Sequence, residues 1–203
     1  MIYSAQDILG VAPVQPGDNL FLINKRAIEE EILKNYSFVD TVDINRRFPD
    51  TLEINIRESQ LLAYVEYEGA YYVINRRCEI LSKSDAMGVS GYIRISGVDP
   101  LAPRIGEQLA LGEAEDGKED YLAELMELML ENELYSQVQW IDASNVSALK
   151  FNYGSSMTVN MGGNEELERK FNMLESMIAD RADNDRGTID LSKVGEGHFI
   201  PEQ

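Results

Sequence analysis

The chain contains one histidine and one cysteine in 203 residues, which leaves little material for a catalytic or metal centre. A Ser-His-Asp centre needs a rigidly held histidine, and His198 lies in residues 195–203, which we interpret as a C-terminal tail. Metal sites made of histidine and cysteine clusters are excluded by number. Cys78 begins the run Cys78-Glu79-Ile80-Leu81, which is typical of a small, half-buried strand residue rather than of a reactive thiol.

Two loops contain residues of types that bind ions. Residues 183–187 resemble part of a calcium loop, but an EF-hand with Gly187 at its sixth position would place Ala182 first and Lys193 twelfth. Neither residue can bind Ca²⁺, so we predict a polar turn. Gly162-Gly163-Asn164 precedes an expected helix, whose N-terminus could attract an anion. Two glutamates follow in the first turn of that helix, which indicates capping instead.

The chain is strongly acidic, with 36 acidic and 18 basic residues and a formal net charge of −18. Binding to phosphate groups needs clustered Lys and Arg, so we predict no nucleic-acid partner. Residues 60–203 carry 26 acidic and 12 basic residues, a net charge of −14, which suits solubility or a basic patch on a protein partner. A carboxylate pair for glycoside hydrolysis stays open because acids are frequent, although no motif marks one pair.

We therefore predict that the protein is not an enzyme, has no catalytic, cofactor-binding or metal-binding residues, and has no small-molecule substrate. No apolar stretch approaches the roughly 20 residues that a membrane-spanning helix needs, and no signal peptide is visible. The single cysteine excludes an intrachain disulfide. If the chain is part of a membrane protein, its anchor is expected upstream.

Residues 1–59 show the pattern of a small α+β unit. Ser4-Ala5-Gln6-Asp7 resembles a capping box that starts a short helix. A second helix is predicted from the cap Asn24 to about Lys34, because its apolar residues recur every fourth position. Alternating residues on both sides of Phe48-Pro49-Asp50 predict two strands joined by a turn. A leading strand near Leu20–Ile23 would complete a three-stranded sheet.

Residues 60–194 show the pattern of a larger mixed β-domain with flanking helices. Its expected helices run from about Lys118 to Leu134 and from Asn164 to about Ala179. Its expected strands are Leu61–Tyr67, Ala70–Ile74, Cys78–Leu81, Tyr92–Ser96, Val138–Asp142, Ala148–Tyr153, Met157–Met161 and Gly187–Leu191. We therefore predict an α+β protein with domains at residues 1–59 and 60–194 and a tail at residues 195–203.

The first unit resembles a POTRA domain, the polypeptide-transport-associated module. The resemblance rests on Ser4–Leu9, on Pro16–Phe21, and above all on Val39–Glu58. That last stretch resembles the family pattern of a valine-rich strand, an arginine, an aromatic residue, a proline and a second strand that ends in Arg or Glu. The POTRA resemblance implies two helices on a small three-stranded sheet.

The second unit resembles the β-domain of the FtsQ/DivIB family of bacterial cell-division proteins. The matching residues are Ala63-Tyr64-Val65, Tyr72-Val73-Ile74-Asn75, Ile95-Ser96-Gly97, Met157–Gly162 with Lys170 and Leu174, and Ile189-Asp190-Leu191. In one turn the family often has Asp before Gly, and here Asn75-Arg76-Arg77-Cys78 stands instead. A proline is common where Tyr36-Ser37 stands. Both departures concern turn geometry.

The FtsQ/DivIB resemblance implies a single-pass protein of the cell membrane with these domains on the extracytoplasmic side. It also implies a scaffold that binds division proteins of the FtsB/DivIC and FtsL type during septum formation. An alternative is a POTRA-containing assembly or transport factor that binds polypeptides, in which a further POTRA repeat should follow. The mixed β-pattern of residues 60–203 favours the division scaffold.

The resemblance also implies a partner-binding site at the last strand of the β-domain, where a strand of the partner would be added. Here that segment is Thr188, Ile189, Asp190, Leu191 and Ser192. As the final strand before a tail it is expected at a sheet edge, where unpaired N–H and C=O groups can template another strand. An ordinary edge strand, blunted by Asp190 and Lys193, is the alternative interpretation.

Overall fold

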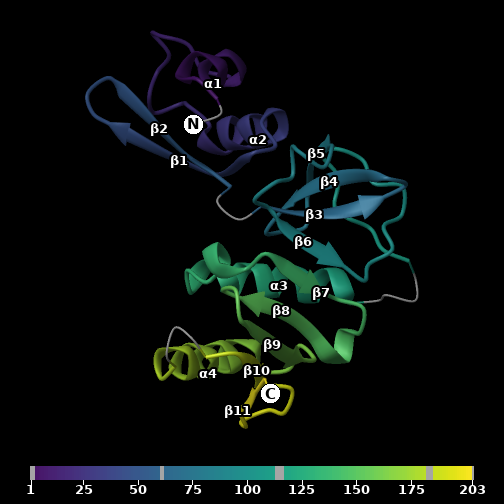
Figure 1. Ribbon diagram of the computed structural model, residues 1–203. Helices are drawn as coiled ribbons and strands as arrows, with labels where there is room; N and C mark the ends of the chain where they lie inside the picture. Colours follow the sequence, from purple (N-terminus) through teal and green to yellow (C-terminus); the bar gives the residue numbers. More distant parts are fainter. Residues whose placement is uncertain (1–2, 60–61, 113–116, 182–184, 203) are drawn as a thin grey trace. The chain divides into compact units, whose positions relative to one another are not determined.

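A computed structural model of the chain describes residues 3–59, 62–112, 117–181 and 185–202. It divides into two compact units, Met1–Gln60 and Leu61–Gln203, which are described separately below (Figure 1). Residue 60, at the expected domain junction, and part of the expected loop at residues 183–187 lie outside the described residues. In the described residues, no helix is long and apolar enough to cross a membrane.

The first unit packs two helices against a β-hairpin. Its elements are α1 (Ala5–Val11), α2 (Lys25–Asn35), β1 (Val39–Arg47) and β2 (Thr51–Glu58). The predicted capping box at the start of α1 is confirmed, because the Ser4 side chain accepts from the Asp7 N–H and the Asp7 carboxylate accepts from the Ser4 N–H. Ile28 and Ile32 of α2 are fully buried against the alternating apolar residues of β1.

The sheet of the first unit has two strands among the described residues, so the predicted leading strand near Leu20–Ile23 is wrong. Polar contacts of Asn19 bend this segment into a turn: its side chain accepts from the Phe21 N–H and its carbonyl from the Leu22 N–H. The Ile23 carbonyl then accepts a hydrogen bond from the Arg46 guanidinium (2.7 Å). The Arg46 side chain of β1 therefore anchors this segment, and among the described residues the backbone hydrogen bonds of a third strand are absent here.

The second unit is built on a mixed sheet of nine strands, in the order β11-β10-β9-β8-β7-β6-β3-β4-β5 (Figure 1). The strands are β3 (Leu62–Tyr67), β4 (Ala70–Asn75), β5 (Ile80–Ser84), β6 (Ile93–Ser96), β7 (Trp140–Asp142), β8 (Leu149–Tyr153), β9 (Met157–Gly162), β10 (Gly187–Asp190) and β11 (His198–Pro201). The helices are α3 (Lys118–Glu131) and α4 (Leu167–Ala179). The predicted α+β fold class is confirmed.

One face of this sheet is covered by α3 and α4. Alternate strand residues such as Val65, Ile141 and Val159 join the helices in one buried core. The residues between them, such as Tyr64 and Trp140, therefore lie on the opposite face, which neither helix covers. The helix α4 begins at Leu167 rather than at Asn164, because Gly162 and Glu166 adopt left-handed backbone angles that interrupt the turn.

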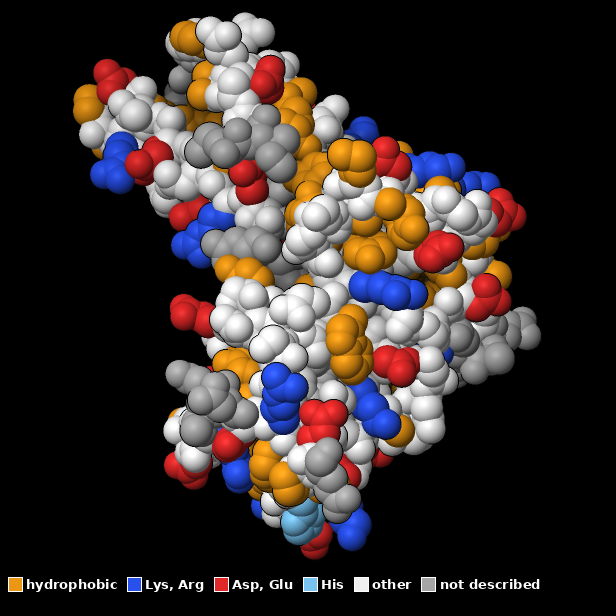
Figure 2. All heavy atoms as spheres, in the orientation of Figure 1, with side chains coloured by type: hydrophobic (Ala, Val, Ile, Leu, Met, Phe, Trp, Pro, Cys, Tyr) orange, Lys and Arg blue, Asp and Glu red, His pale blue; other side chains and the backbone are white. Residues whose placement is uncertain are grey.

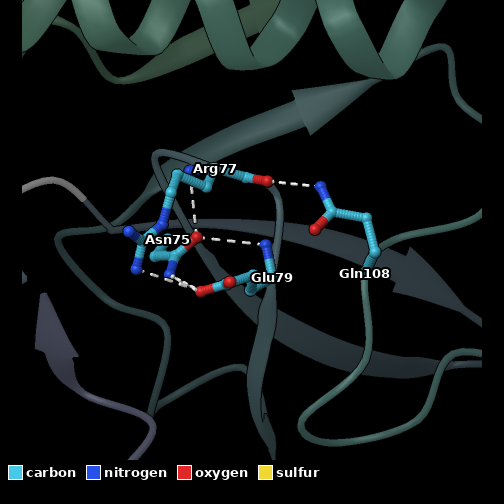
Figure 3. A network of polar contacts seen from close by, with 4 residues as sticks. All are labelled: Asn75, Arg77, Glu79 and Gln108. Carbon is cyan, nitrogen blue, oxygen red and sulfur yellow. Dashed lines mark hydrogen bonds and ion pairs between the residues drawn. The ribbon is translucent and has the colours of Figure 1, made fainter. Parts of the chain in front are cut away.

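A buried asparagine organises the turn between β4 and β5 (Figure 3). The Asn75 side-chain oxygen accepts from the N–H groups of Arg77 (2.9 Å) and Glu79 (3.0 Å), and its NH₂ group donates to the Glu79 carboxylate (2.7 Å). The Gln108 side chain donates to the Arg77 carbonyl. Cys78 is fully buried with φ of +59°, so it occupies a turn and not the half-buried strand position that we predicted.

Candidate partner-binding edge

The predicted site, Thr188–Ser192, lies inside the sheet and not at its edge. The strand β10 pairs in parallel with β9, so that Thr188 faces Thr158, and antiparallel with β11, so that Thr188 also faces Ile200. Both rows of backbone groups of β10 are therefore used within the sheet. The interpretation of this segment as an edge strand is wrong, because residues that we assigned to a tail form one more strand.

The side chains of Thr188–Ser192 anchor the strand on both faces of the sheet. Ile189 and Leu191 are completely buried in the core. Burial tends to raise the pKa of Asp190, but hydrogen bonds from Ser192 and Asn160 and the charge of His198 outweigh it and hold the pKa below its usual value. The segment therefore supports the neighbouring strand β11.

The edge of the sheet on this side is β11, whose register with β10 runs from Gly187↔Pro201 to Asp190↔His198. The Phe199 ring packs against the core and under the Arg181 guanidinium, 4.1 Å from the ring centroid. Ile200 is 54% exposed. Among the described residues, no strand pairs with the outer side of β11.

The hydrogen bonds around β10 and β11 show which backbone groups of the edge point outward. The Glu202 N–H donates to the Arg186 carbonyl (3.0 Å), so Glu202 faces the sheet. Backbone groups alternate in direction along an antiparallel strand, so Ile200 and His198 also face β10. Phe199 and Pro201 therefore present their backbone outward. Proline has no N–H, so within β11 the outward groups are the Phe199 N–H and the two carbonyls of Phe199 and Pro201.

The pairing of β10 with β9 agrees with this assignment. The N–H groups of Gly187 and Leu191 donate to β9 and its preceding residue, at the carbonyls of Ser156 (3.3 Å) and Asn160 (2.8 Å). By alternation, Thr188 and Asp190 face β11, opposite Ile200 and His198. Two independent sets of hydrogen bonds thus give the same outward groups.

Sequence reasoning missed β11 because the strand is short and follows a glycine-containing loop. The signal that was available is Phe199-Ile200 followed by Pro201, since two strand-forming residues before a proline are typical of an edge strand. A four-residue strand ending in proline is also a usual protection against unspecific edge pairing. Within β11, the Phe199 N–H is therefore the one backbone donor that points away from the sheet.

The residues considered for catalysis lie apart from one another. His198 is exposed on β11, 3.5 Å from the Glu196 carboxylate. Burial, with the nearby charges of Glu119 and Asp120, raises the pKa of the Cys78 thiol to about 12. The described residues contain no group of three or more His, Cys, Asp or Glu side chains placed to hold a metal ion.

Comparison with known proteins gives a family match for the first unit and relatives along most of the chain. A family model for the POTRA domain of FtsQ type matches residues 2–59. The chain is 21% identical over 173 residues to the cell division protein DivIB of Clostridium tetani, covering 85% of this chain and 64% of that protein. It is 20% identical over 204 residues to DivIB of Clostridium acetobutylicum, covering 100% of this chain and 79% of that protein.

A third relative is the cell division protein FtsQ of Anaeromyxobacter, which is 30% identical over 115 residues, 52% of this chain and 38% of that protein. The chain thus spans less than two thirds of the C. tetani and Anaeromyxobacter proteins. The POTRA match covers residues 2–59, and the similarity to DivIB proteins extends along most of the sequence, so the two findings together support identification of the chain with the FtsQ/DivIB cell division proteins.

Proposed function

We propose that the chain is a non-enzymatic scaffold of the bacterial divisome. It binds division proteins of the FtsB/DivIC and FtsL type outside the cytoplasmic membrane during septum formation, as part of a protein with a single membrane anchor. The observation that carries this proposal is the open edge of β11 in a chain of a cell-division family. The alternative of a transport or assembly factor with POTRA repeats is less well supported, because residues 62–202 form a mixed sheet of a different architecture.

The binding mode in this proposal is strand addition to β11. A partner strand accepts a hydrogen bond from the Phe199 N–H and donates to the carbonyls of Phe199 and Pro201. The residues Thr188–Asp190 of β10 pair with β11 on its inner side, so they support the site without touching the partner backbone. Exposed Ile200 gives the partner one apolar side chain to recognise.

A pair of variants at Phe199 separates the backbone from the side chain. Phe199→Pro removes the outward N–H, and Phe199→Ala keeps that N–H while removing the same ring. Loss of a backbone hydrogen bond, with a partner carbonyl left unpaired, costs about 1–3 kcal/mol, or roughly 5- to 150-fold in affinity. We expect Phe199→Pro to bind an FtsB/DivIC-type extracytoplasmic segment more weakly than Phe199→Ala by that factor.

The comparison is made by isothermal titration calorimetry after thermal melts show that both variants are folded. Ile200→Pro is a reference for stability only and not for binding, because its N–H faces β10 and its loss lowers the melting temperature. Equal affinities of folded Phe199→Pro and Phe199→Ala would refute strand addition at β11. A wild-type chain that binds no such segment would refute the scaffold function.

A further inference from the structure

The face of the sheet that neither helix covers carries an aromatic and cationic row. The register places Tyr64 of β3 opposite Arg94 of β6, and Arg94 opposite Trp140 of β7. Arg94 is exposed, and the two rings are half-exposed. Figure 2 shows Lys and Arg side chains next to hydrophobic ones over the strands of this unit. Tyr, Trp and Arg are the residue types that dominate binding energy at protein interfaces.

A hollow of about 430 Å³ continues this row towards the β11 edge. Trp140 lines one end, and Ile200 and Pro201 of β11 line the other. Between them lie Asn152, Thr158 and Thr188, which face one another across neighbouring strands. The exposed Arg186 and Glu202 also line the hollow. The hollow therefore connects the proposed strand-addition edge with the aromatic and cationic row.

The arginines Arg94 and Arg186 of this surface lack the acidic partners that several other arginines have. Arg26, Arg47 and Arg169, for example, pair with Glu30, Glu53 and Glu166. In the described part of the chain, no hydrogen bond or ion pair engages the side chain of Arg94 or Arg186. In a chain with twice as many acids as bases, two unpaired guanidinium groups beside a tryptophan are complementary to carboxylates of another molecule.

We propose that this surface, defined by Arg94, Trp140 and Arg186, binds an acidic extended segment of the same partner that adds its strand to β11. The proposal rests on the proposed function. Strands lie about 4.8 Å apart, so the six steps from a strand added beside β11 to β6 span about 29 Å. An extended chain covers about 3.3 Å per residue. About nine residues next to the added strand are therefore enough to bring a carboxylate to Arg94.

Trp140 is the single tryptophan of the chain, so its fluorescence reports on this surface directly. The probe is the extracytoplasmic segment of the FtsB/DivIC-type protein from the same organism, with any tryptophan replaced by Phe, added to the full 203-residue chain. We expect the complex to shield Trp140 from acrylamide quenching. We also expect Arg94→Glu and Arg186→Glu to weaken binding at least fivefold each, and the loss to grow at low salt.

The matched control is Arg57→Glu, the same charge change at an exposed arginine of the other unit, with an expected change below twofold. The arginine side chains are exposed, so the variants should fold, and thermal melts verify this. The inference is overturned if the wild-type chain binds and Phe199→Pro weakens binding, but Trp140 stays accessible and both arginine variants bind normally. That result leaves the strand-addition site intact.

Two other results would also overturn the inference. If Trp140 becomes shielded as the chain alone is concentrated, a second copy covers the surface and not a partner segment. If the wild-type chain binds no FtsB/DivIC-type segment, the proposed function fails and this inference fails with it.

Discussion

Replacing Asn75 by Ala should destabilise the second unit and leave partner binding intact. The Asn75 side chain is completely buried and makes three hydrogen bonds across the β4–β5 turn (Figure 3). The variant leaves the N–H groups of Arg77 and Glu79 without their acceptor and the Glu79 carboxylate without one donor. At about 1 kcal/mol for each hydrogen bond, the expected loss is about 3 kcal/mol of the free energy of unfolding.

The assay is thermal denaturation followed by circular dichroism. For a unit of this size, 1 kcal/mol shifts the melting temperature by about 2–4 °C, so Asn75→Ala should melt about 6–12 °C lower than the wild type. Asn172→Ala, at an exposed position of α4 in the same unit, is the matched control and should change stability by less than about 0.5 kcal/mol.

A melting temperature within about 2 °C of the wild type would refute this reasoning, because water would then replace the Asn75 hydrogen bonds at no cost. Affinity for the partner, measured below the melting transition, should equal that of the wild type. The reason is that β4 and β11 are near opposite ends of the strand order.

Three further predictions concern buried or paired groups. The Cys78 thiol, with its pKa raised to about 12 by burial, should react with a thiol reagent at pH 8 only after unfolding, as followed by absorbance. Hydrogen bonds from Ser144 hold the pKa of Asp142 below 3.8, so this carboxylate stabilises the unit above that pH and loses the effect as the pH falls below it. Ser144→Ala should bring the Asp142 pKa back towards 3.8 in an NMR titration. Ile189→Pro, in a buried strand facing β9, should cost about 3 kcal/mol or more and lower the melting temperature before it changes binding.

Elements with strong local signals could be predicted from the sequence. The capping box at Ser4 and the stripe of Ile28 and Ile32 gave the helices of the first unit correctly. The neighbouring strands expected at Leu61–Tyr67 and Ala70–Ile74 are found as β3 and β4, and both residues of the turn between them, Glu68 and Gly69, have the positive φ that a tight hairpin turn requires. In each case a few neighbouring residues determine the backbone.

The features that the sequence did not reveal depend on contacts far along the chain. The segment near Leu20 is held not only by the local contacts of Asn19 but also by Arg46, more than twenty residues later, which donates to the Ile23 carbonyl. The edge strand of the sheet is β11 because the Phe199 ring packs against the core and against the Arg181 guanidinium. For this reason we propose the site on β11 instead of β10. In both cases the proposed site is a strand at the edge of the sheet. Trp140 and Arg94 are 46 residues apart, and only the register brings them side by side.

The most direct test of strand addition is amide hydrogen exchange at β11, measured by NMR with and without the FtsB/DivIC-type segment. The Phe199 N–H points out of the sheet, while the N–H groups of His198 and Ile200 face β10. In the free chain we predict fast exchange at Phe199 and slow exchange at its two neighbours. In the complex Phe199 should become protected as well. Formation of the complex with Phe199 still in fast exchange would contradict a partner strand at this edge.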